Sequence, residues 1–60
     1  MYAPKTYVKE IENSVEQLDK FVDECCKDYR KITTVAHTKS NVTVKENKDK
    51  IIATVIVEAL

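Results

Sequence analysis

The sequence predicts a small α+β protein in which one amphipathic helix packs on a three-stranded, mostly antiparallel sheet, in the order β-α-β-β. Sixty residues form one domain, residues 1–60. Apolar side chains recur at helical spacing between residues 14 and 30. Residues 50–60 read as a strand with apolar side chains on both faces. Such a strand needs cover on both sides, and a single helix covers only one.

Residues 5–12 are consistent with two structures. Their β-branched and aromatic content favours a strand over about residues 5–11. However, Val8 and Ile11 also continue the apolar spacing of the helix that follows. The alternative fold is therefore a long N-terminal helix followed by a β-hairpin.

Ser14 and Gln17 have the spacing of a capping box, which favours a helix that begins at this point and ends near residue 30. Arg30 and Lys31 lie at its C-terminal end, where the helix dipole favours positive charge. The face predicted to pack on the sheet contains Val15, Leu18, Phe21, Val22, Cys25 and Tyr29.

Residues 32–45 are predicted to be extended, with a bulge or wide turn at Ser40-Asn41. A two-residue hairpin loop at Asn47-Lys48 would place His37 opposite Glu58. The chain contains no glycine, so any residue in the left-handed αL region is expected to be an asparagine or aspartate. The lack of glycine also removes the phosphate-binding loops and nucleophile elbows that require it.

The net charge is zero, but it is unevenly distributed. Residues 10–28 contain seven acidic and two basic side chains, and residues 30–50 contain six basic and two acidic ones. Since no aromatic side chains are interleaved with the basic group, we expect no nucleic-acid partner. No apolar run is long enough for a membrane span, and the N-terminus lacks the pattern of a signal peptide. We therefore expect a cytoplasmic protein with reduced cysteines.

The sequence contains no recognisable catalytic motif. Adjacent helical residues point about 100° apart, so Cys25 and Cys26 cannot both ligate one metal. Glu24 and Asp28 would raise a thiol pKa instead of lowering it, and His37 has no partner at a motif spacing. We expect no catalytic residue, no metal site and no cofactor, and therefore not an enzyme.

Small domains often gain stability by oligomerising, and we expect a homodimer. The predicted oligomer or partner interface contains Tyr7, Ile52, Thr54, Ile56 and Leu60. A second candidate for contact with a partner is an acidic stripe of Glu12, Glu16, Asp19 and Asp23. A third hypothesis is a small-ligand sponge with a pocket at the dimer interface, where Tyr2, Tyr7 and Tyr29 stack on the ligand.

The order of segments 6–8, 15–29, 31–35 and 52–58 resembles that of short β-α-β-β proteins found in Bacillus and its phages, among them sporulation proteins of similar length. In its size and lack of catalytic motifs the chain is also similar to phage-encoded anti-defence inhibitors, such as the short Hachiman anti-defence proteins. The resemblance implies an interaction protein that inhibits a host defence protein, or alternatively a sporulation-associated accessory protein. It assigns no functional residues.

Overall fold

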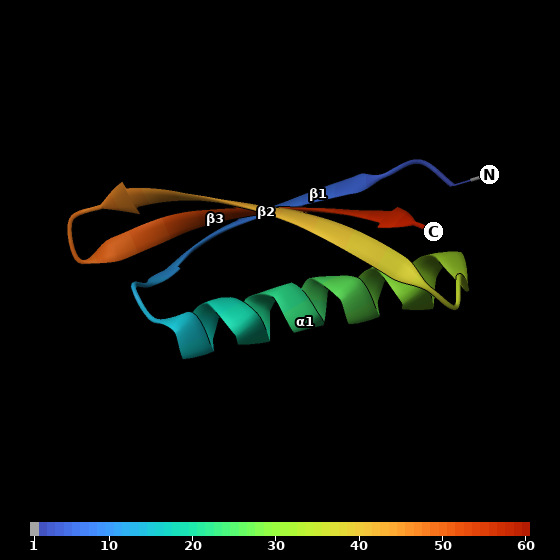
Figure 1. Cartoon of the computed structure of the whole chain (residues 1–60), viewed down its shortest axis with the longest axis horizontal. Helices are drawn as coiled ribbons and strands as arrows, with labels where there is room; N and C mark the ends of the chain where they lie inside the picture. Colours follow the sequence, from blue (N-terminus) through green and yellow to red (C-terminus); the bar gives the residue numbers. More distant parts are fainter. Residues whose placement is uncertain (1) are drawn as a thin grey trace.

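The computed structural model describes residues 2–60. Its elements are β1 (Lys5–Glu12), α1 (Val15–Thr33), β2 (Thr38–Asn47) and β3 (Lys50–Ala59). The strands form one antiparallel sheet in the order β1-β3-β2, and α1 runs along one face of it (Figure 1). The predicted β-α-β-β fold is confirmed, and the alternative with a long N-terminal helix is wrong.

The junction between β1 and α1 is formed by Ser14. Its backbone is extended, and its Oγ accepts a hydrogen bond from the Gln17 N–H at 3.5 Å. The Ser14 N–H in turn donates to the Glu12 carbonyl at 2.8 Å. This side chain satisfies one of the free donors of the first helical turn, so the predicted N-cap is confirmed.

The helix ends at Thr33, beyond the predicted end, and the extended structure predicted for residues 32–36 is wrong. Thr33 is buried and donates its hydroxyl hydrogen bond to the Tyr29 carbonyl at 2.7 Å. Thr34 then adopts the αL conformation and donates its N–H to the Arg30 carbonyl at 2.8 Å. Burial of Thr33 and this C-terminal cap therefore override the strand preference of the two threonines.

The hairpin loop is Lys48-Asp49, one residue later than predicted, so the pairing of β2 with β3 is shifted by two residues. The predicted register would have placed Lys45 opposite Lys50, whereas the observed one places Lys39 opposite Glu58 with 3.3 Å between Nζ and Oε1. The observed register therefore avoids a pair of like charges. His37 does not face Glu58. Because the shift is even, each side chain stays on its predicted face.

The ladder between β2 and β3 is continuous from Thr38 to Asn47, so the predicted bulge at Ser40-Asn41 is wrong. Positive φ angles occur at Thr34 and Lys48, not at an asparagine or aspartate as predicted. At these positions the helix cap and the tight hairpin determine the backbone conformation.

The core lies between α1 and one face of β3, which contributes the buried side chains of Ile51, Ala53, Val55 and Val57. Cys25 and Tyr29 are buried against it from α1, and Leu18, Phe21 and Val22 pack around it. Val15 is the exception to the predicted helix face, because at the start of the helix it remains 76% exposed. None of the described elements covers the other face of the sheet.

Candidate interaction surfaces

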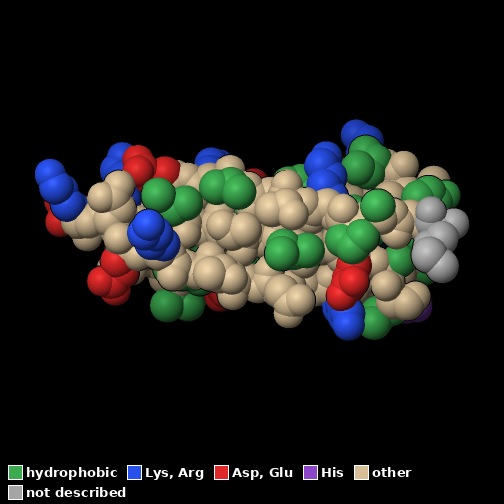
Figure 2. All heavy atoms as spheres, turned by 90° about the horizontal axis from the view of Figure 1, so that it is seen from above, with side chains coloured by type: hydrophobic (Ala, Val, Ile, Leu, Met, Phe, Trp, Pro, Cys, Tyr) green, Lys and Arg blue, Asp and Glu red, His purple; other side chains and the backbone are tan. Residues whose placement is uncertain are grey.

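The open face of the sheet is the face that points away from α1. Its centre is formed by Ile52, Thr54 and Ile56 of β3, and the residues paired with them on β1 and β2 are Thr6, Val8, Glu10, Asn41, Thr43 and Lys45. Figure 2 shows the sheet side of the molecule, where hydrophobic side chains form separate groups among charged side chains, other side chains and backbone. Such a mixed composition is typical of non-obligate protein interfaces and of ordinary solvated sheet faces.

The predicted interface residues do not all share this face. Ile52, Thr54 and Ile56 lie together on it, whereas Tyr7 pairs with Val55 on the face toward α1. Leu60 follows the end of β3 and is exposed. Sequence reasoning missed Val8, which is next to Thr54 on the open face. Its position follows from strand alternation, because Val8 and Tyr7 must point to opposite faces.

Tyr7 connects β1 to α1. Its hydroxyl donates to Asp28 Oδ2 at 2.6 Å, and Lys5 Nζ lies 3.5 Å from the same oxygen. Desolvation and the hydrogen bond to Asp28 raise the pKa of Tyr7. The hydrogen bond from Tyr7, together with the charge of Lys5, lowers the pKa of Asp28. The polar groups of this cluster already have partners within the chain.

The three tyrosines proposed to stack on a ligand do not share a surface. Tyr29 is buried, and its hydroxyl donates to the Ala3 carbonyl at 2.9 Å. Tyr7 is half-buried beside Asp28, and Tyr2 is exposed. The structure therefore offers no common tyrosine surface on which a ligand could stack.

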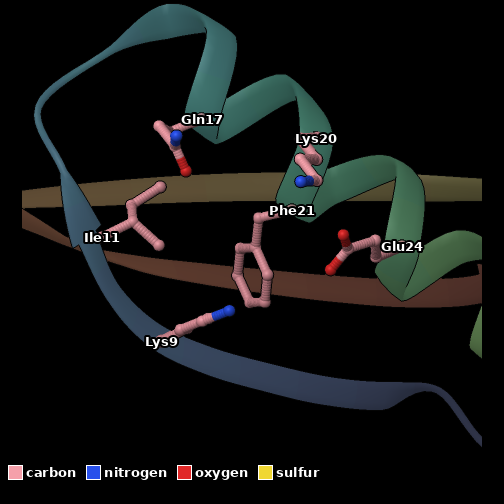
Figure 3. A pocket seen from close by; sticks show the side chains of 6 residues that line it. All are labelled: Lys9, Ile11, Gln17, Lys20, Phe21 and Glu24. Carbon is pink, nitrogen blue, oxygen red and sulfur yellow. The ribbon is translucent and has the colours of Figure 1, made fainter.

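A shallow hollow lies between β1 and the first half of α1. Figure 3 shows the six side chains that line it: Lys9, Ile11, Gln17, Lys20, Phe21 and Glu24. Lys9 Nζ lies 5.8 Å from the centre of the Phe21 ring, a cation–π distance. The volume of the hollow is about 90 Å³, whereas typical small-molecule sites have about 300–1,000 Å³.

The potentially reactive side chains are not arranged as a reactive centre. Cys25 is buried, and desolvation, followed by the charges of Cys26 and Glu24, raises the pKa of its thiol. Cys26 is half-buried, and neither cysteine is in a disulfide. His37 is exposed in the loop after α1, where its carbonyl accepts a hydrogen bond from the Leu60 N–H at 3.1 Å. These positions favour a packing role for the cysteines.

The acidic stripe is divided between two elements. Glu16, Asp19 and Asp23 are exposed on α1, but Glu12 belongs to β1 and pairs with Lys50. Asp23 also forms an ion pair with Lys27 at 3.0 Å. The stripe is therefore not a continuous helix face of four carboxylates.

The β2 edge, defined here as residues 39–47, is a surface that sequence reasoning missed. Every residue from 41 to 47 is exposed, including Val42 at 42% and Val44 at 43%. Both valines point toward the α1 side of the sheet. Within the described chain, β2 pairs only with β3, so the outer backbone groups of this edge have no strand partner.

Across residues 2–60, no helix has both the length and the apolar character needed to cross a membrane. The same residues contain no group of three or more side chains suited to holding a metal ion. Compared with models of known protein families, with curated proteins and with solved structures, the chain has no significant match.

Proposed function

We propose that this chain is a non-enzymatic protein-interaction module that acts as a homodimer and binds a protein target on its open face. The observation that carries the proposal is the exposure of aliphatic side chains on this face. Ile56 is 38% exposed and Val8 is 63% exposed, and none of the described elements covers them. Association with a protein surface removes such side chains from water.

The charges around Ile52 indicate the kind of surface that would be complementary. Glu10 flanks Ile52 on the β1 side and Lys45 flanks it on the β2 side. An aliphatic centre therefore lies between an acid and a base. The complementary target surface has an aliphatic centre, a basic group that faces Glu10 and an acidic group that faces Lys45. Matched charges of this kind determine the orientation and rate of association.

The state of the thiols also supports binding over catalysis. A nucleophilic cysteine requires a lowered pKa and access to substrate. Cys25 has the opposite properties, since burial raises its pKa. The tyrosine hydroxyls of Tyr7 and Tyr29 are likewise occupied by hydrogen bonds within the chain.

The test compares two isoleucine variants, Ile56→Asp on the open face and Ile32→Asp on α1. Both side chains are exposed in the folded chain, so circular dichroism should show that both variants fold. The first target class to assay is a bacterial anti-phage defence protein, because of the resemblance to phage anti-defence inhibitors. The functional readout is plaque formation on cells that carry the defence system.

We expect the wild type and Ile32→Asp to bind the target and restore plaque formation. Ile56→Asp should lose at least about tenfold in affinity, because it places a charge in a surface that becomes desolvated. If Ile56→Asp binds as well as the wild type, the open face is not the target surface. If no defence protein binds the wild-type chain, the proposed class of target is wrong.

A further inference from the structure

We infer that the β2 edge is the homodimer interface, where a second copy of the chain pairs antiparallel with β2 around a two-fold axis at Thr43. The product is a six-stranded sheet with both α1 helices on the same face. The inference rests on the proposed function only in assuming a homodimer, and it identifies the surface through which the two chains associate.

The middle of the β2 edge, residues 42–44, lacks the usual protection of an edge strand, and the charge that β2 places on the covered face, Glu46, lies near the hairpin. Natural edges are protected by proline, by a bulge, or by charges that point toward the covered face. β2 contains no proline, and its ladder with β3 is continuous. At its middle, Val42 and Val44 are the side chains on the covered face. An exposed edge of this kind is suited to pairing with another strand.

Symmetry restricts the ways in which two copies can pair. In an antiparallel ladder, directly opposed residues alternate between hydrogen-bonded and non-hydrogen-bonded pairs. A two-fold axis preserves this alternation only if it passes through the middle of one directly opposed pair. The two residues of that pair are then the same residue from each copy. The axis is then perpendicular to the sheet, and directly opposed side chains share a face. Both helices must consequently lie on the same side.

Charge selects Thr43 as the central residue. An axis at Val42 would place Lys39 directly opposite the partner's Lys45, which is unfavourable. An axis at Val44 would place Val42 opposite the partner's Glu46.

An axis at Thr43 has neither defect. It places Val42 opposite the partner's Val44 and Asn41 opposite the partner's Lys45. The overlap then covers the whole of residues 39–47. Four valines, two from each copy, meet on the helix side of the sheet, between the two α1 helices. The half-exposed apolar side chains of the monomer thereby obtain cover without any change in the fold.

This dimer leaves the open face free. The open faces of the two copies become neighbouring halves of one surface, related by the two-fold axis. A target could therefore contact both copies at once, and binding through two sites raises the overall affinity.

The first test uses a single cysteine at the two-fold axis. At Thr43, the two Cα atoms would lie about 4.5–5.5 Å apart, which is within reach of a disulfide. Thr54 is the matched control, because it pairs with Thr43 one strand further inward. In this dimer it lies three strand spacings, about 14 Å, from its own copy. Thr43→Cys and Thr54→Cys are two separate variants, and each also carries Cys26→Ser, since Cys26 is only half-buried.

We expect Thr43→Cys to form a covalent dimer under mild oxidation and Thr54→Cys to remain uncrosslinked. Crosslinking of Thr54→Cys alone would indicate a dimer through the open faces. That outcome would overturn the β2 edge assignment while the homodimer of the proposed function stands. If neither variant crosslinks and the wild-type mass is that of one 6.9 kDa chain, both the edge assignment and the homodimer are wrong.

The second test compares Val44→Lys with Ile56→Lys by light scattering over a concentration series. The two side chains have similar exposures of 43% and 38%, so the cost to the monomer should be similar. Val44→Lys should have the mass of one chain and an unchanged circular dichroism spectrum, whereas Ile56→Lys should have twice that mass. The reverse result would overturn the inference.

Discussion

Ala53 of the central strand β3 has a charged neighbour on β1 and an apolar neighbour on β2. On the helix side of the sheet, Lys9 of β1 flanks it at one edge and Val44 of β2 flanks it at the other. Lys9 Nζ lies over the Phe21 ring at 5.8 Å. Val44 remains 43% exposed.

The same contrast extends along both edge strands. β1 is joined to the helix by buried Ile11 and by the hydrogen bond from Tyr7 to Asp28, whereas no residue between 41 and 47 is buried. The inward-pointing Lys9 lies at the middle of β1, whereas the inward-pointing side chains at the middle of β2 are Val42 and Val44. We therefore expect the β1 edge to be less available for further strand pairing than the β2 edge.

Truncating one apolar side chain on each edge strand should give the largest difference in unfolding free energy between β1 and β2. Ile11→Ala removes part of the core and should cost about 2–5 kcal/mol of unfolding free energy, which is comparable to the whole stability of about 3–5 kcal/mol expected for so small a core. Val44→Ala should cost only about 0.5 kcal/mol at low protein concentration. Urea denaturation at several protein concentrations measures both values.

Protein concentration distinguishes the two edges further. The cost of Val44→Ala in unfolding free energy should rise with protein concentration. Dimerisation stabilises the folded wild type, and the variant lacks this gain. Equal costs for the two variants in dilute solution would contradict the contrast between the edges.

The next effect concerns association. Lys9→Val removes the inward charge from β1 and makes both edges available for pairing. Contacts between unlike edges do not close on themselves, so we expect assemblies larger than two chains whose mass increases with concentration in sedimentation experiments. Lys9→Gln, which remains polar, is the control. A Lys9→Val mass equal to the wild-type mass would show that this lysine does not protect the edge.

A smaller effect is expected at the start of the chain. Tyr29→Phe removes the hydrogen bond to the Ala3 carbonyl and leaves the ring in the core, so it should cost about 1 kcal/mol of unfolding free energy. Hydrogen exchange should become faster in residues 3–7 but remain unchanged in β2. Faster exchange confined to β2 would contradict this assignment.

Tyr7→Phe should have the smallest effect on the free energy of unfolding. It removes the hydrogen bond to the Asp28 carboxylate, which is exposed to solvent. The pKa of Asp28 is lowered, so its stabilisation is present above the ordinary value of 3.8 and is lost as the pH falls below it. The pKa of Tyr7 is raised, so its stabilisation is present below the ordinary value of 10.0 and is lost as the pH rises above it.

The difference in melting temperature between wild type and Tyr7→Phe should therefore be largest at intermediate pH and decrease at both extremes. Melting curves recorded between about pH 2 and 11 test this. A difference that does not change with pH would mean that the hydrogen bond between Tyr7 and Asp28 does not contribute to stability.

Local sequence patterns predicted much of the fold. Residues 50–60 were correctly predicted to form a strand of which the single helix covers one face, and Ser14 correctly marked the start of the helix. The end of the helix was not predictable in the same way, because Thr33 and Thr34 favour a strand locally. Burial of Thr33 against the core decides their conformation, and that contact depends on tertiary structure.

The candidate surfaces were predictable only in part. Ile52 and Ile56 were correctly placed on one face because strand alternation depends on neighbours in sequence alone. The importance of Val42 and Val44 depends on β2 being an edge strand and on α1 leaving them exposed. Strand order and helix position are properties of the whole fold, so residue spacing could not indicate them.

The strand order β1-β3-β2 also has a kinetic consequence. Both outer strands pair only with β3, the last of the three along the chain. A polypeptide synthesised from its N-terminus therefore cannot begin its sheet until residues 50–59 are available, and the ladder of β1 must join positions as distant as Lys5 and Val57. Contacts of such long range slow folding relative to helical proteins of the same size. The rate at which this protein acquires its structure should consequently depend most on substitutions in β3.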